Sequence, residues 1–236
     1  MSLAPTDRIY VALDTPDIEK ALSLAKMLAG HVGGVKLGME FYYANGPEGA
    51  RAISALGMPL FLDLKFHDIP NTVAGAVRST LDLHPAILNV HAQGGPAMMQ
   101  AAADAVETAG DDKPLLIAVT VLTSLSDDDL QAVGVKDGTE SQVVRLAMLT
   151  QSCGLGGVVC SPREIKAIRA ACGPDFKLVV PGIRPDWAAA GDQKRITTPA
   201  QAIRDGADYI VIGRPITGAD DPLAAAKRIA DELAGL

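Results

Sequence analysis

The sequence predicts an α/β fold, a single domain built as a (β/α)8 barrel. Short apolar segments rich in β-branched residues alternate with helical patterns along all 236 residues. These segments recur about every 28 residues, a spacing that suits eight strand–helix units closed into a TIM barrel. Neither a linker nor a low-complexity tract divides the chain. A doubly wound open sheet is the alternative architecture for the same alternation.

The composition fits a barrel with an aliphatic core. Apolar residues make up 48% of the chain and charged residues 21%, so a large core can be buried and disorder is not expected. Aromatic residues make up only 4%. We therefore expect aliphatic side chains to fill most of the interior.

The first half of the chain contains four expected strand–helix units. Thr15 and Pro16 open the first helix, because proline is favoured at the first helical position. Pro96 opens the fourth helix in the same way, whereas Gly46 and Pro47 interrupt the second. The expected strands are residues 8–13, 34–37, 59–64 and 87–90, and the expected helices are residues 15–30, 39–56, 71–84 and 96–108.

The second half contains four more units and two longer loops. The Ser-Pro pair at 161–162 and the Thr-Pro pair at 198–199 predict helix caps. Ser126, followed by three aspartates, predicts a capped and solvated helix start. Residues 181–195 are rich in Pro, Gly and charge, and we interpret them as a mobile loop. The expected strands are residues 115–121, 157–160, 177–180 and 209–212, and the expected helices are residues 139–153, 162–173, 199–206 and 222–233.

Charged residues stand at the ends of the first three strands. Asp14 follows the first strand, Lys36 ends the second, and Asp63 and Lys65 share one face of the third because side chains alternate along a strand. In a barrel the carboxyl ends of the strands meet at one face, so these groups should converge. For each residue alone, a solvated strand end is the alternative. Asp68 adds a further carboxylate three residues after the lysine.

The position of Lys65 between carboxylates favours its charged form. A charged lysine suits a proton donor better than a nucleophile. A lysine that forms a Schiff base needs instead a depressed pKa, which an apolar pocket or cationic neighbours provide.

The loops after the seventh and eighth strands predict a phosphate site. Such loops commonly bind phosphate in these barrels. Gly213 lets the backbone approach a ligand, and Arg214 can make a bidentate contact with an anion. Pro181, Arg184 and Gln193 lie in the preceding loop, which could close over a phosphate.

Several partner and site classes are not expected. The net charge of −7 and the lack of a basic cluster argue against a nucleic-acid partner. No apolar run approaches about 18 residues, so we expect no membrane partner. The N-terminal segment MSLAPTDR lacks the apolar region of a signal peptide, and we expect a soluble, cytoplasmic protein.

The cysteines and histidines give no metal or disulfide signature. The three cysteines lack CxxC spacing and are expected to be reduced and buried. The four histidines lie on different elements, where we expect packed or surface roles, and a metal site is not supported. His91, at a strand end, is the one possible neighbour of the site. These residues are Cys153, Cys160, Cys172, His31, His67, His84 and His91.

Taken together, seven segments resemble the orotidine 5'-monophosphate decarboxylases along the whole chain. They are VALDT, GVKLG, FLDLKFHDIPNTV, VTVLTS, PGIRP, GDQKR and IGRPIT. DLKFHDIPNT is fairly specific, whereas the shorter D-x-K-x-x-D pattern is shared with related phosphate-binding barrels. Metal-dependent relatives, such as 3-keto-L-gulonate 6-phosphate decarboxylase, typically carry a magnesium-binding glutamate in the strand where this chain has Lys36.

The resemblance implies cofactor-independent decarboxylation of orotidine 5'-monophosphate to uridine 5'-monophosphate, the last step of de novo UMP biosynthesis. It implies that Lys65 protonates C6 of the pyrimidine within a catalytic network of Lys65, Asp63, Asp68 and Lys36. It also implies a homodimer in which Asp68, Ile69 and Thr72 act in the partner's site. The substrate-binding residues that it implies are Asp14 and Lys36 for the ribose, with Asp63 near the substrate carboxylate; Thr123 and Ser124 for the pyrimidine; and Pro181, Arg184, Gln193, Gly213 and Arg214 for the phosphate region.

Three alternative functions remain open. A metal-dependent sugar-phosphate decarboxylase or synthase of the same barrel class would lose its activity to a chelator. A pentose-phosphate epimerase would need metal-ligand histidines at several strand ends, which the sequence does not offer. A non-catalytic phosphate-binding module would bind a nucleotide tightly without turnover.

Overall fold

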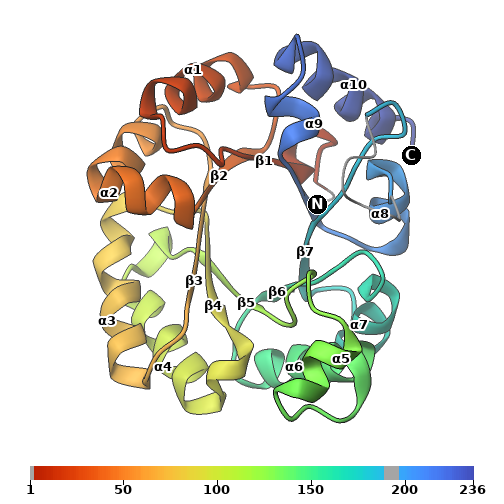
Figure 1. Ribbon diagram of the computed structural model, residues 1–236. Helices are drawn as coiled ribbons and strands as arrows, with labels where there is room; N and C mark the ends of the chain where they lie inside the picture. The colour runs from red at the N-terminus through yellow and green to blue at the C-terminus, as the bar shows by residue number, and fades with distance from the viewer. Residues whose placement is uncertain (1–2, 189–196) are drawn as a thin grey trace.

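The computed structural model describes residues 3–188 and 197–236 and contains a closed barrel of parallel strands (Figure 1). The strands follow one another around the barrel in chain order, and the eighth pairs with the first. This closure confirms the predicted (β/α)8 barrel and excludes the open sheet. The strands are β1 (Ile9–Ala12), β2 (Gly34–Gly38), β3 (Leu60–Phe66), β4 (Ile87–His91), β5 (Leu115–Val119), β6 (Gly157–Val159), β7 (Lys177–Pro181) and β8 (Tyr209–Ile212).

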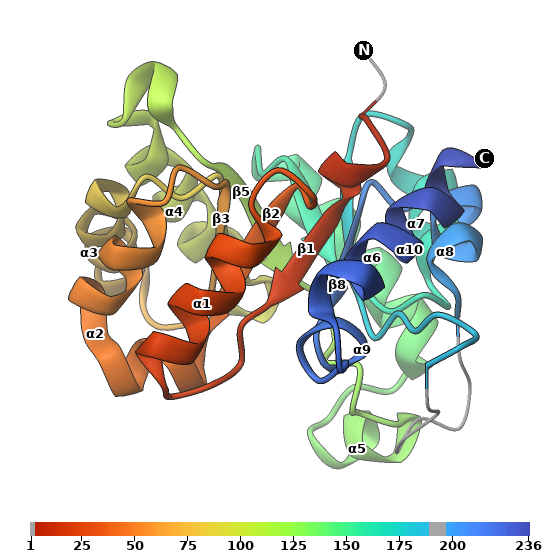
Figure 2. The same ribbon diagram turned by 90° about the horizontal axis from the view of Figure 1, so that it is seen from above.

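Helices form a ring around the strands (Figure 1). They are α1 (Ile18–Leu28), α2 (Met39–Ser54), α3 (Pro70–Thr80), α4 (Pro96–Glu107), α5 (Asp127–Ala132), α6 (Gly138–Ser152), α7 (Ile165–Cys172), α8 (Pro199–Asp205), α9 (Arg214–Thr217) and α10 (Pro222–Ala234). Figure 2 shows the N-terminus at one end of the barrel and α5 and α9 at the other, where the strands end. Within the described ranges, no helix combines the length and apolarity that a membrane span requires.

Most of the predicted helix signals are confirmed. Gly46 adopts a φ of +63° and breaks the regular geometry of α2 next to Pro47. The Thr198 side chain accepts the N–H of Gln201 and caps α8, and Ser126 forms a capping box at α5. The sequence did not predict α9, a four-residue helix directly after β8.

Two predicted helix starts are wrong, because the predicted residues form hydrogen-bonded turns that precede the helices. Asp17 caps α1, and the Thr15 hydroxyl only accepts the N–H of Asp17 at 3.2 Å. At the predicted start 161–162, the N–H of Ser161 donates to the Glu164 carboxylate at 2.7 Å. This turn delays the beginning of α7 to Ile165.

Alternate residues of the strands divide the core into two parts. One set faces the helices and forms the larger apolar cluster. The other set fills the barrel interior, where the ring of Tyr10 meets those of Phe61 and Tyr209 edge-to-face at 6.4 and 5.6 Å. Most of the core is aliphatic, as predicted, and the three aromatic rings of the barrel interior pack among aliphatic side chains. All three cysteines are buried.

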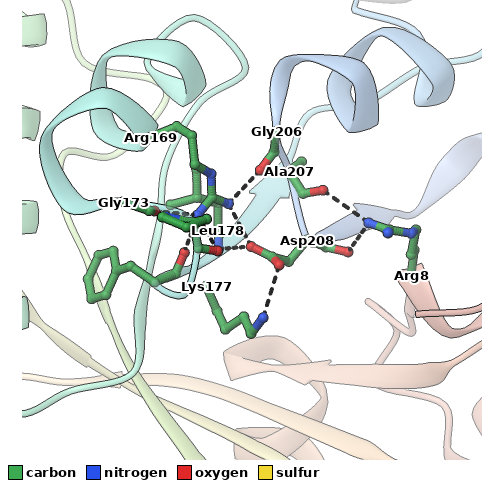
Figure 3. A network of polar contacts seen from close by, with 10 residues as sticks. Arg8, Arg169, Gly173, Lys177, Leu178, Gly206, Ala207 and Asp208 are labelled. Carbon is green, nitrogen blue, oxygen red and sulfur yellow. Dashed lines mark hydrogen bonds and ion pairs between the residues drawn. The ribbon is translucent and has the colours of Figure 1, made fainter. Parts of the chain in front are cut away.

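A charged network, here called the anchor network, joins the N-terminal ends of β7, β8 and β1 (Figure 3). It consists of Arg8, Arg169, Lys177 and Asp208. The Asp208 carboxylate pairs with Arg169 at 2.8 Å and with Lys177 at 3.2 Å, and it accepts the N–H of Leu178 at 2.9 Å. The guanidinium groups also donate to main-chain carbonyls: Arg169 to those of Gly173, Pro174, Phe176 and Gly206, and Arg8 to those of Ala207 and Asp208.

Candidate active site

A cavity of about 490 Å³ opens at the carboxyl ends of the barrel strands. This volume lies within the range of small-molecule sites. Most of the residues that the sequence predicts for the site line this cavity: Asp14, Lys36, Asp63, Lys65, Thr123, Pro181, Arg184, Gly213 and Arg214. Together with Val159 of β6, residues from seven of the eight strands, or from the loops directly after them, meet here.

A larger hollow of about 770 Å³ borders this cavity beside α5 and α6. The two share a wall of five residues: Val121, Leu122, Thr123, Pro181 and Gly182. Arg163 and Glu164 line the larger hollow, whereas the four charged residues from the first three strands line the smaller one. We therefore place the candidate active site in the smaller cavity.

Asp14, Lys36, Asp63 and Lys65 form an alternating series of carboxylates and ammonium groups, here called the lysine–aspartate chain. Lys36 Nζ lies 2.9 Å from Asp14 Oδ1 and 3.2 Å from Asp63 Oδ2. Lys65 Nζ lies 2.6 Å from the other oxygen of Asp63. The predicted convergence of these four residues is confirmed. Each charge has an opposite charge beside it, which is the arrangement that lets ionised groups be buried.

Lys36 is buried in the lysine–aspartate chain, with 8% of its surface exposed. Burial by itself lowers the pKa of Lys36, but the charges of Asp63 and Asp14 and their hydrogen bonds outweigh it and raise the pKa. Lys36 is therefore a fixed positive charge at neutral pH.

Gly38 lies close to the ion pair of Lys36 and Asp14, with little space for a side chain. A Cβ atom at Gly38 would lie 2.9 Å from Lys36 Nζ and 3.1 Å from Asp14 Oδ1. Any larger residue would push the ion pair apart. The GVKLG motif contains this glycine, but the sequence alone did not indicate its role.

Lys65 reaches the cavity through an irregularity in β3. Its backbone adopts a φ of +53°, a left-handed conformation that residues other than glycine rarely adopt. The pairing register between β3 and β4 shifts between Leu62 and Phe66. The predicted end of this strand at Leu64 is therefore wrong, because pairing resumes at Phe66 beyond the irregularity.

Asn89, on β4, belongs to the site although the sequence alone did not indicate it. Its side chain accepts the N–H of Lys65 at 2.8 Å and donates to Asp63 Oδ1 at 2.7 Å. One signal could have indicated it. In the buried strand ILNVH, Asn89 lies on the same face as Ile87 and His91, and a polar residue inside a buried strand needs a partner.

His91 ends β4 and stacks on His67, with 5.2 Å between the ring centroids. Burial lowers the pKa of His91 to about 4, and the nearby charges of His67 and Lys65 act in the same direction. Its Nδ1 atom is buried and has no hydrogen-bond partner among the described residues. Within those residues, no group of three or more His, Cys, Asp or Glu side chains is arranged to hold a metal ion.

Three predicted site residues do not line the cavity of their own chain. Asp68, Ile69 and Thr72 lie at the start of α3 and are exposed, with 67% of the Ile69 surface accessible. The Asp68 carboxylate accepts the N–H of Ile69 at 2.6 Å. These residues are therefore available on the surface of the barrel and are not part of the cavity wall.

The remaining predicted residues lie around the opposite rim. Arg184 is buried, and its main-chain N–H donates to the carbonyl of Thr197 at 3.1 Å. Ser124 is exposed and does not line the cavity, whereas Thr123 does. Gln193 and most of the charged part of the predicted mobile loop lie outside the described residues.

Comparisons with known proteins agree along nearly the whole chain. Residues 7–229 match the model of the orotidine 5'-phosphate decarboxylase / HUMPS family. The chain is 56% identical over 229 residues to an orotidine 5'-phosphate decarboxylase of Paramagnetospirillum magneticum, covering 95% of this chain and 97% of the relative. It is 55% identical over 232 residues to the protein of the same name from Rhodospirillum rubrum, covering 96% and 94%.

Solved structures give the same result. The crystal structure of orotidine 5'-phosphate decarboxylase from Lactobacillus acidophilus superposes with a TM-score of 0.85 at 39% identity. The superposition covers 95% of this chain and 98% of that one.

Proposed function

Because the chain belongs to the orotidine 5'-phosphate decarboxylase family and converts orotidine 5'-monophosphate into uridine 5'-monophosphate, we propose that Lys65 is the acid that protonates C6. The observation that carries this proposal is the lysine–aspartate chain. It holds the Lys65 ammonium at the cavity wall, 2.6 Å from Asp63 Oδ1. Lys65 and Asp63 are the reacting pair in this proposal, and Lys36 and Asp14 support them.

Loss of carbon dioxide from the pyrimidine leaves an electron pair at C6. This pair lies in the plane of the ring, where the π system cannot delocalise it. An ammonium fixed beside C6 stabilises the charge as it develops, which is electrostatic preorganisation. The bond to Asp63 uses one of the three N–H groups of Lys65, so another can point at C6 and deliver its proton.

Asp63 and Lys36 keep Lys65 in position. Asp63 accepts from both lysines and from Asn89, so its carboxylate cannot rotate without breaking several hydrogen bonds. Asp14 is half-exposed at the cavity wall, where its carboxylate and the Lys36 ammonium can bind the ribose hydroxyls. Thr123, on the wall shared with the larger hollow, is proposed to contact the pyrimidine, with Ser124 beside it.

The phosphate is proposed to bind at the rim formed by the loops after β7 and β8. Pro181, Arg184, Gly213 and Arg214 line that rim, and two guanidinium groups supply positive charge for a dianion. Gln193, from the same loop as Arg184, completes the proposed set. The phosphate lies far from C6, so its binding energy can hold the reacting end of the substrate in place.

A homodimer with a shared site is the second part of the proposal. Asp68, Ile69 and Thr72 are exposed at and just before the start of α3, and Ile69 is one of the most exposed large apolar side chains of the described residues. Docking of a second chain would bury Ile69 and bring Asp68 to the partner's lysine–aspartate chain. A cytoplasmic location is also proposed, and the three buried free thiols support it.

A buried ammonium distinguishes this site from that of a metal-dependent sugar-phosphate decarboxylase. Lys36 occupies the space between Asp14 and Asp63 and neutralises both carboxylates. A divalent cation placed there would meet a positive charge instead of a free ligand.

The proposal is tested by ultraviolet absorbance during conversion of orotidine 5'-monophosphate with chelator present. We expect the wild type to be active and Lys65→Ala to lose at least about 10³-fold in kcat. Lys166→Ala is the matched control, because Lys166 is an exposed lysine on α7 paired with Asp205. A wild type that needs its metal restored, or a Lys65→Ala variant within tenfold of the wild type, would contradict the proposal.

Mixed dimers test the shared site. A Lys65→Ala chain paired with an Asp68→Ala chain has one site with both defects and one intact site. Random mixing of the two inactive variants should therefore restore about a quarter of the wild-type activity. If each site belongs to a single chain, mixing restores nothing.

A further inference from the structure

Asn89 lies next to the site but does not line the cavity. It is fully buried, with 0% of its surface exposed, in the interior face of β4. Its amide joins two different parts of β3: the backbone N–H of Lys65 at 2.8 Å and the carboxylate of Asp63 at 2.7 Å. Both described hydrogen bonds of the Asn89 side chain therefore go to the reacting pair, Lys65 and Asp63.

The amide replaces a strand–strand hydrogen bond. Leu62 pairs with Leu88 and Phe66 with Val90, so three residues of β3 stand opposite Asn89 alone. A strand with extra residues bulges and turns a side chain in a new direction. The left-handed backbone of Lys65 lies within this bulge, and Asn89 supplies the acceptor that the regular ladder would have supplied.

At neutral pH an amide of this length meets both requirements at once. The carbonyl oxygen accepts from a main-chain N–H while the NH₂ group donates to a carboxylate, so the orientation of the amide is fixed by its partners. An ionised aspartate at this position would place a second negative charge against Asp63. A leucine of similar volume would leave both partners unsatisfied in a buried place.

We propose that Asn89 is a positioning residue of the decarboxylation, which fixes the backbone of Lys65 and the carboxylate of Asp63 so that the ammonium faces C6. This inference rests on the proposed role of Lys65. Asn89 acts through Lys65 and Asp63 and does not touch the substrate. Its loss therefore lowers kcat and leaves the binding of the nucleotide nearly unchanged.

The test compares Asn89→Leu, Asn89→Asp and the wild type. For Asn89→Leu we expect kcat to fall about 100-fold, since a displacement of about 1 Å at a reacting group has this effect. KM for the substrate and Kd for uridine 5'-monophosphate should stay within about threefold. Asn45→Asp is the matched control, with wild-type kinetics expected, because Asn45 lies on α2 and its hydrogen bonds within the described residues go to the main-chain carbonyls of Pro16 and Phe41.

The pH profile gives a readout that a purely structural role would not move. A protonated aspartate offers one O–H donor and one carbonyl acceptor and so imitates the amide. The kcat of Asn89→Asp relative to the wild type should therefore rise as the pH is lowered, whereas the ratio for Asn89→Leu should stay flat. The charged or titratable groups nearby are Lys36, Asp63, Lys65, His67 and His91. These groups are present in all the variants. A change with pH in the ratio of variant kcat to wild-type kcat therefore reports the titration of residue 89.

Each outcome is decisive. Wild-type kcat in both Asn89 variants overturns the inference, as does a loss that appears only as a smaller folded fraction measured by circular dichroism. Should Asn89→Leu not fold, Asn89→Asp decides alone, and a flat pH ratio overturns the inference. Lys65→Ala is assayed in parallel. If that variant is active, the proposed role of Lys65 fails, whereas an inactive Lys65→Ala with active Asn89 variants overturns the inference about Asn89 alone.

Discussion

The two ends of the barrel carry charged clusters that are built in different ways. The anchor network at the N-terminal ends of the strands relies on arginines, whose donors end largely on main-chain carbonyls (Figure 3). The lysine–aspartate chain at the carboxyl ends uses lysines and bonds mainly among side chains. The planar guanidinium suits several fixed acceptors, while the lysine ammonium is a compact point charge.

This difference indicates that the anchor network serves the stability of the barrel and the lysine–aspartate chain serves the chemistry. The anchor network ties α7, β7, β8 and β1 together and lies away from the cavity. The lysine–aspartate chain lines the cavity and includes the left-handed residue Lys65, an unfavourable backbone conformation held by Asn89. In barrels of this kind, residues at the N-terminal face serve stability and those at the carboxyl face serve function.

The same substitution at each end should separate the two roles. Asp63→Asn removes the charge between the two lysines, and we expect kcat to fall about 10³-fold because Lys65 loses its orientation. The free energy of unfolding should fall by less than for the equivalent change at Asp208, by about 1 kcal/mol, because Lys36 keeps its ion pair with Asp14 and Lys65 lines the open cavity. Steady-state kinetics and urea unfolding measure the two effects. An Asp63→Asn enzyme that is unstable but fully active would show that the lysine–aspartate chain serves stability and not the chemistry.

Asp208→Asn should show the opposite pattern. This carboxylate is mostly buried and shared by Arg169, Lys177 and the N–H of Leu178, so removal of its charge leaves the partly buried guanidinium of Arg169 without an anionic partner. We expect a loss of about 3 kcal/mol in the free energy of unfolding. The kcat of the folded fraction should match the wild type. Reduced turnover per folded molecule would show that the anchor network also serves the chemistry.

Arg214→Ala tests which cavity holds the substrate. Removal of a phosphate contact should raise KM about 30-fold and lower kcat/KM with it. Arg163→Ala is the matched arginine of the larger hollow and should leave KM unchanged. An unchanged kcat/KM for Arg214→Ala, or a large effect of Arg163→Ala, would move the phosphate to the larger hollow.

The smallest effect is expected from His91. Its pKa of about 4 lies below the value of about 6.5 for an unfolded histidine, so the folded state binds fewer protons between these values. The stability from the neutral imidazole is complete above pH 6.5 and is lost as the pH falls toward 4. In His91→Gln the free energy of unfolding should therefore fall less between pH 7.5 and pH 5 than in the wild type. The difference corresponds to the uptake of at most one proton on unfolding, and urea unfolding at the two pH values measures it. An identical slope in both proteins would exclude this contribution.

The strands and the charges at their ends could be predicted from local patterns. A buried strand needs a run of apolar residues, and barrel closure brings the ends of consecutive strands together, so the meeting of Asp14, Lys36 and Asp63 followed from topology alone. The caps at Thr198 and Ser126 could be predicted because each hydroxyl directly precedes a helix. Thr15 failed because Asp17 caps the same helix more directly.

Features that depend on a neighbouring strand could not be predicted in this way. The alternating pattern of β3 continues through Lys65, so nothing in the segment itself indicates the bulge that β4 imposes. Asn89 acts on residues 24 and 26 positions away. Asp68 and Thr72 lie on the surface of one chain, and their proposed role needs a second chain.

Asp63 Oδ1 accepts hydrogen bonds from both Lys65 and Asn89, and this affects the step in which Lys65 regains its proton. Once Lys65 has given up its proton, it is a neutral amine, and its attraction to Asp63 weakens. Asn89 and Lys36 still bind the carboxylate at 2.7 and 3.2 Å, so Asp63 stays in place while the amine is neutral. Lys65 can then take a proton from water entering the open cavity and return to a geometry that was never lost. Lys65 is therefore reprotonated without a rearrangement of the carboxylate that orients it.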